Sequence, residues 1–126
     1  MRLQEMTENL PEHELQALLS LPEEDVLCLL GKELIGRSAA PQIPSHLIER
    51  AERWLNAQKN MLRKAVCESD KIKEIATTDT DQMAIALATL EILVSLVIPV
   101  NPITLTALLI KKGLTSFCST KWKEDE

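Results

Sequence analysis

The most informative pattern in this chain is a nearly uncharged apolar run that a pair of prolines interrupts. Residues 83–110 carry a single charged side chain, that of Glu91, and Pro99 and Pro102 stand near the middle of the run. Taken as one segment, the run is long enough to be a membrane-spanning helix. Taken as two segments, it predicts a pair of short helices that fill a core.

Local signals favour the two-helix interpretation. Asn101 is a suitable N-cap, and Pro102 suits the first turn of a helix. In a single span these residues would lie near the bilayer midplane, where an amide and freed backbone groups need partners. We therefore predict helices over about 81–98 and 102–112 that form a buried hairpin, with membrane insertion of 83–110 as the alternative.

The longest amphipathic pattern runs from an expected N-cap at Ser45 to about Cys67. Apolar residues recur every three or four positions along it, and the opposite face is charged. Arg50 and Arg53 belong to the charged face. Glu49 precedes Arg53 by four residues, which is the favourable order for an ion pair on a helix.

Shorter patterns complete the helical content. Ser20 and Glu23 are spaced as a capping box that would open a second helix, and Gly31 would weaken the middle of that helix by about 1 kcal/mol relative to alanine. The remaining segments are a first helix over about 11–19, the second helix to Ile35, a loop over 37–44, a short helix over about 69–76 and one further turn over 114–118.

Composition favours helices over strands. Aromatic residues make up 2% of the 126 residues and glycine occurs three times, so the core has to be built from aliphatic side chains. The length suits one domain. We therefore predict an all-α fold, a single compact bundle of about five to six helices with a buried C-terminal helical hairpin. Residues 1–120 would form this domain, with 37–44 as an internal loop and 121–126 as a charged tail.

Charge and cysteine usage bear on partners and compartment. The formal net charge of −5 argues against nucleic-acid binding, which needs an excess of basic residues. The N-terminus lacks the continuous apolar stretch of a secretory signal. Cys28, Cys67 and Cys118 are odd in number and form no C-x-x-C pair. They predict free thiols in a reducing compartment, and hence a cytoplasmic location.

Side chains that suggest chemistry are few. Glu91 lies on an apolar helix, where a carboxylate can act as an acid or a base, but the sequence supplies no second group for it. We favour an exposed carboxylate, or one paired with a basic residue of the long helix. His13, His46 and the three cysteines lack the close spacing of a zinc site, and no phosphate-binding loop or catalytic motif occurs. We predict no catalytic residue, metal, cofactor or small-molecule substrate.

Trp122 stands apart from the predicted core. It lies between Lys121 and Lys123 in the tail, outside any apolar periodicity. One interpretation is that the indole folds back onto the domain. The other is that it serves as an exposed anchor for a partner, because tryptophan is favoured at the centres of interfaces.

Together these patterns favour a non-enzymatic role. Apolar helix surface in excess of one small core, with a long mixed-charge helix, indicates a protein–protein interaction or regulatory module. Such a module would be a small accessory subunit or adaptor of a multi-protein system, or would associate with itself. Trp122, Glu91, Arg50 and Arg53 are the candidate partner-binding residues. The alternative function is that of a membrane-active protein that inserts residues 83–110.

Overall fold

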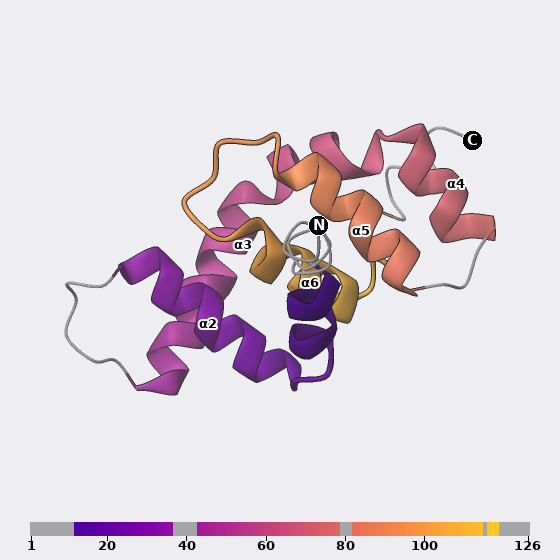
Figure 1. The fold of residues 1–126 in the computed structure, drawn as a ribbon. Helices are drawn as coiled ribbons and strands as arrows, with labels where there is room; N and C mark the ends of the chain where they lie inside the picture. The colour runs from indigo at the N-terminus through magenta and orange to yellow at the C-terminus, as the bar shows by residue number, and fades with distance from the viewer. Residues whose placement is uncertain (1–11, 37–42, 79–81, 115, 119–126) are drawn as a thin grey trace, which may run out of the picture.

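The chain folds into a bundle of α-helices (Figure 1). The computed structural model describes residues 12–36, 43–78, 82–114 and 116–118, the side chains of 76–78 excepted. Residues 12–19 are helical and precede α2 (Glu23–Ile35), α3 (Pro44–Cys67), α4 (Asp70–Thr78), α5 (Gln82–Leu93) and α6 (Pro102–Lys112); residues 114 and 116–118 are helical as well. No strand occurs among these residues, which confirms the predicted all-α fold.

The centre of the bundle is α6. Every residue from Thr104 to Ile110 is buried, and the helix packs against α2 on one side and α5 on the other (Figure 1). A helix enclosed in this way has no face left for charged side chains, so its two lysines fall in the last turn. The pairing of α5 with α6 is the predicted hairpin, but only α6 is buried along its length, because α5 keeps exposed residues such as Leu87 and Glu91.

The two ends of α6 are held by different devices. The Asn101 side chain accepts a hydrogen bond from the Ile103 N–H at 2.9 Å, which confirms the predicted N-cap. The Glu33 carboxylate of α2 reaches the same end and accepts from the Asn101 N–H at 2.8 Å and the Thr104 hydroxyl at 2.7 Å. At the other end Gly113 adopts a φ of +97°, which a glycine takes up without strain.

Helices α2 and α3 approach closely at Gly31. A Cβ atom at this position would collide with the backbone of Leu47, so only glycine lets the two helices meet there. Leu30 and Ala51 are fully buried on the same two helices. The helix-weakening glycine noted in the sequence therefore has a structural role in the α2–α3 contact.

Two predicted helix starts are wrong. The cap of α2 is Pro22, which makes no side-chain bond, and the Ser20 hydroxyl donates instead to a carbonyl of the preceding helix at 2.7 Å. Three acidic residues in the first turn complement the dipole of α2. Helix α3 begins at Pro44, so Ser45 lies inside its first turn. Because the proline in the first turn has no N–H that would need a partner, this helix start has less need of a side-chain cap.

Helix α5 is shorter than predicted. It ends at Leu93 rather than at about residue 98. Pro99 disfavours the helical conformation of the preceding residue, Ile98, alone, so the earlier end is a property of the folded chain. The N–H of Val94 still donates to the Leu90 carbonyl at 2.9 Å, and the Leu96 N–H closes a turn onto Leu93 at 3.1 Å. The connection to α6 is thus held by backbone hydrogen bonds where it leaves the helix.

A disulfide bond overturns the prediction of three free thiols. Cys67, the last residue of α3, is bonded to Cys118 with the two Cα atoms 5.4 Å apart, and both residues are buried. Cys28 is a free thiol and half-buried. The two bonded cysteines are 51 positions apart in sequence, so only the packing of the C-terminal turn against α3 brings them together.

The apolar run is divided between two short helices. Helices α5 and α6 have 12 and 11 residues, whereas a helical span needs about 20. In the part of the chain that the structure describes, no helix has both the length and the apolar character to cross a membrane.

Candidate functional site

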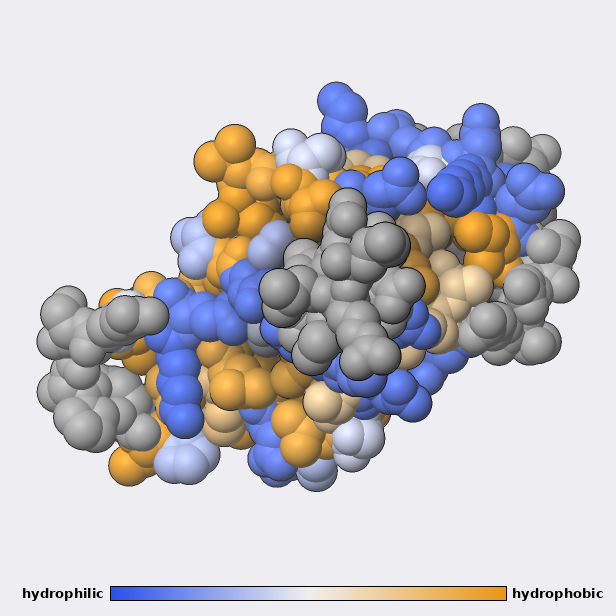
Figure 2. Space-filling model, viewed as in Figure 1, coloured by the Kyte–Doolittle hydropathy of each residue, from blue (hydrophilic) through white to orange (hydrophobic). Residues whose placement is uncertain are grey.

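An exposed apolar surface follows α5 into its connection with α6. Leu87, Glu91 and Val94 are spaced i, i+4 and i+7 and are all exposed, so they share one face of the helix. Val97 follows in the connection, with a relative exposure of 104%, and Val94 is 59% exposed. Figure 2 shows apolar side chains gathered where this connection projects from the bundle. We call Leu87, Val94 and Val97 the apolar ridge.

The ridge is presented by an anchored segment. Leu93 and Val100, at the two ends of the connection, are buried in the core. Between them Leu96 and Ile98 are half-buried and pack against the same core. The side chains that face the core therefore hold the segment in place, and Val94 and Val97 point away from the core.

Glu91 lies within the face that carries the ridge. Its carboxylate pairs with the Lys71 ammonium of α4 at 3.4 Å. The predicted exposed carboxylate is confirmed, and the alternative, a partner on the long helix, is wrong. The two side chains are 73% and 65% exposed, and a surface ion pair of this kind contributes about 0–1 kcal/mol. This is the setting of a surface ion pair, without the enclosed surroundings of an acid–base catalyst.

The other predicted partner-binding residues lie elsewhere. The Arg53 guanidinium pairs with the Glu49 carboxylate at 2.9 Å, which confirms the predicted pair on α3. Arg50 is exposed on the same helix. Among the described contacts, none joins either arginine to Glu91. Trp122 lies outside the described residues.

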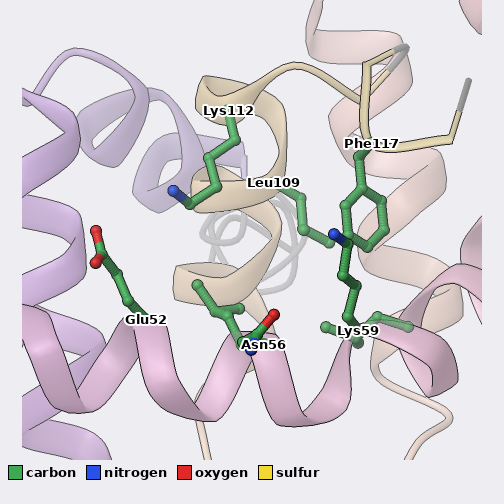
Figure 3. A pocket seen from close by; sticks show the side chains of 8 residues that line it. Glu52, Asn56, Lys59, Leu109, Lys112 and Phe117 are labelled. Carbon is green, nitrogen blue, oxygen red and sulfur yellow. The ribbon is translucent and has the colours of Figure 1, made fainter.

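A cavity of about 330 Å³ lies between α3, α6 and the C-terminal turn (Figure 3). We call it the α3–α6 cavity. Its lining combines apolar side chains with a polar rim: Leu55, Leu62, Leu109 and Phe117, together with Glu52, Asn56, Lys59 and Lys112. Figure 3 shows Lys59 rising from α3 beside the Phe117 ring, and Lys112 entering from the end of α6.

Phe117, one wall of the cavity, is held from two directions. The Arg63 Nε–H of α3 donates to the Phe117 carbonyl at 3.1 Å, and its guanidinium carbon lies 5.4 Å from the centre of the Phe117 ring. The next residue, Cys118, is bonded to Cys67. The C-terminal turn is therefore fixed against α3 by a hydrogen bond, a cation–π contact and a covalent bond.

The lining of the cavity can cover an apolar group and places the ammonium groups of Lys59 and Lys112 beside it. The Lys112 ammonium is 3.3 Å from the Glu23 carboxylate and only 34% of its side chain is exposed. Among the described residues that line it, none is a histidine, cysteine, serine or threonine. Within the described residues, no group of three or more histidine, cysteine or acidic side chains is placed to hold a metal ion.

Sequence patterns missed both features. The ridge depends on where α5 ends, and the predicted extension of that helix to residue 98 concealed it. The cavity needs side chains from α3, α6 and the C-terminal turn, for which no local pattern exists.

Comparison with known proteins leaves function to the structure. No family model matches this chain, and no match was found among curated proteins or among solved structures.

Proposed function

We propose that this protein is a non-enzymatic helical protein–protein interaction module, a small accessory subunit or adaptor of a multi-protein system, and that the apolar ridge is its docking surface. The observation that carries the proposal is the full exposure of Val97 on a segment whose neighbouring side chains are anchored in the core. An exposed apolar residue that the fold holds in place is available to a partner without any rearrangement of the domain.

The size of the ridge limits what it does alone. Burial of an aliphatic side chain is worth about 1.5–3 kcal/mol, so Val94, Val97 and the exposed part of Leu87 supply roughly 4 kcal/mol. This gain is no larger than the cost of association itself, which is about 4 kcal/mol or more in lost translational and rotational freedom. A stable complex therefore needs further contacts. Glu91, which lies between Leu87 and Val94 on the helix face, supports a partner that offers an apolar groove with a basic residue beside it.

The proposal is tested by paired variants of exposed apolar residues. Val94→Asp combined with Val97→Asp removes the ridge, and Ile43→Asp, at a position that is 57% exposed at the start of α3, is the matched control. We expect a partner from the native host to co-purify with the wild type and with the control. The double variant should lose it while its melting temperature stays unchanged.

Self-association is covered by the same variants. If the partner is a second copy, light scattering should show a dimer for the wild type and the control, and a monomer for the double variant. Equal retention of every bound protein by all three forms, with no change in mass, would contradict the proposed role of the ridge.

The membrane-active alternative is tested separately. Insertion of residues 83–110 would require the buried span of α6, Thr104–Ile110, to leave the core, which counts against it. Flotation with lipid vesicles that Val94→Asp and Val97→Asp together abolish would assign the ridge to a lipid surface and overturn the proposal.

The compartment in which the protein works is a separate point to test. The cytoplasmic location rests on free thiols, and the Cys67–Cys118 bond supports an oxidising compartment instead. Alkylation of thiols at the moment of lysis distinguishes the two. Modification of Cys28 alone is expected outside a reducing compartment, and modification of all three cysteines is expected within one.

A further inference from the structure

The α3–α6 cavity is a site that the apolar ridge does not use. Its wall at Phe117 is held by Arg63 and by the disulfide that follows at Cys118. Its volume of about 330 Å³ lies at the lower end of the range for small-molecule sites, which are largely formed before the ligand binds. We propose that the cavity binds a small molecule with an apolar body and a single carboxylate, and that Lys59 binds the carboxylate.

The floor of the cavity selects the apolar body. It consists of four apolar side chains from three segments of the chain: Leu55, Leu62, Leu109 and Phe117. Two of them, Leu62 and Leu109, are buried, and the other two keep part of their surface accessible. Each methylene group that such a lining covers raises affinity roughly four-fold. A polar ligand would lose hydrogen bonds to water here and would find few replacements.

Lys59 supplies the charge that selects an anion. It is half-buried and stands beside the Phe117 ring (Figure 3), and among the described residues no ion pair includes it. The second ammonium of the lining, that of Lys112, already pairs with the Glu23 carboxylate at 3.3 Å. The charge of Lys59 is therefore the one available to a ligand, and an ion pair that is partly buried is screened less than one on an open surface.

The carboxylates of the site limit the ligand to one negative charge. Asn56 and Glu52 precede Lys59 by three and seven residues, so the three side chains follow one face of α3 along the cavity (Figure 3). Glu52 lies about 10 Å from Lys59 along the helix, so the uncharged end of the ligand would point toward it. A phosphate dianion would meet more repulsion from Glu52 than a carboxylate does.

The same geometry disfavours a cationic ligand. Glu52 is exposed, whereas Lys59 is half-buried, so solvent and salt screen the carboxylate more strongly than the ammonium. The Asn56 amide, which lies between them on the helix, can donate a hydrogen bond to a carboxylate that Lys59 binds. An apolar monocarboxylate therefore fits the lining better than the corresponding amine.

This site goes beyond the proposed function, and the two proposals can fail separately. The described lining contains no residue of α5 or of the connection that carries Val97. The double ridge variant is therefore expected to bind the carboxylate as the wild type does. Sequence patterns predict no small-molecule substrate, because the lining comes from segments that share no local pattern.

Calorimetric titration of the full chain with octanoate tests the proposal. We expect one site per chain with a dissociation constant of about 0.1–1 mM, which the ten or so non-hydrogen atoms of this probe can supply. 1-Octanol should bind several-fold more weakly, and octylammonium should show no binding at the same concentrations. The three probes share one apolar chain, so the comparison isolates the charge.

Two pairs of variants locate the site. Lys59→Gln should weaken octanoate binding about ten-fold, as the loss of a hydrogen bond to a charged group does, and should leave 1-octanol binding unchanged. Lys64→Gln, exposed on the same helix and outside the lining, should change neither. Asn56→Phe fills the cavity from α3 and should abolish the binding of both probes. Asn60→Phe, also exposed and outside the lining, should not.

Four results would overturn the proposal. They are the absence of saturable octanoate binding, binding that survives Asn56→Phe, full octanoate affinity in Lys59→Gln, and octylammonium binding as tight as that of octanoate. Binding that survives Asn56→Phe but is lost with Val94→Asp and Val97→Asp together would place the probe on the apolar ridge instead.

Discussion

At the scale of single residues, small and polar side chains decide how the helices meet. Glu33 illustrates this, because one carboxylate of α2 accepts hydrogen bonds from the Asn101 N–H and the Thr104 hydroxyl at the start of α6. These contacts cross 68 and 71 positions of sequence. They orient the end of the connection that carries Val97, so a residue remote in sequence supports the ridge.

Gly31→Ala tests the α2–α3 contact through the sign of its effect. Helix propensity alone predicts a gain of about 1 kcal/mol. The collision with the Leu47 backbone predicts a loss, since overpacking typically costs about 1–3 kcal/mol, and backbone atoms cannot rotate away. The two effects together leave a net loss of at most about 2 kcal/mol, and we expect the free energy of unfolding, measured in urea, to fall by about 1 kcal/mol.

The matched control is Asn60→Ala, at an exposed position in the middle of α3. It gains helix propensity without a new neighbour and should leave stability unchanged or slightly higher. A Gly31→Ala protein that is more stable than the wild type would show that the two helices do not approach closely at this point.

At the scale of elements, the C-terminal hairpin separates a buried helix from a half-exposed one. Helix α6 is enclosed between α2 and α5, whereas α5 buries residues such as Ala86 and Leu93 but exposes Leu87 and Glu91. The amino-acid sequence of α5 is apolar nearly all round, so its exposed face cannot be recognised from its composition.

Aspartate substitutions measure this difference between the two helices. Leu105 of α6 is fully buried, and Leu87 of α5 is 37% exposed. Leu105→Asp places an unpaired charge in the core at a cost of several kcal/mol, which is comparable with the whole stability of a small domain. We expect no cooperative thermal transition for Leu105→Asp by circular dichroism. Leu87→Asp should lose about 1–2 kcal/mol, because the greater part of its side chain is covered, and similar losses for both would mean that the burial of α6 is misassigned.

At the scale of the whole molecule, the Cys67–Cys118 disulfide closes a long covalent loop. It connects the end of α3 with the C-terminal turn across 51 positions and encloses α4, α5 and α6. The chain therefore carries a covalent link between its longest helix and the wall of the α3–α6 cavity. The disulfide is also the feature that favours an oxidising compartment.

Removal of the disulfide should destabilise the whole bundle. For a loop of this length the chain-entropy argument predicts a loss of about 4 kcal/mol in Cys67→Ala combined with Cys118→Ala. Cys28→Ala, which removes the half-buried free thiol, should lose much less. Urea denaturation with and without a dithiol reductant provides the measurement. Equal stability of the reduced and oxidised wild type would indicate that the bond contributes nothing to the fold.

Sequence by itself determined the elements that depend on local periodicity: an all-α chain, the amphipathic α3 with its Glu49–Arg53 pair, the Asn101 cap and the division of the apolar run at its prolines. These follow from interactions between residues a few positions apart. Only the tertiary structure decided the Cys67–Cys118 bond, the Glu33 contacts, the need for Gly31 and the exposure of Val97. Each of these depends on which helices lie side by side, and a pattern that repeats every 3.6 residues carries no information about its neighbour.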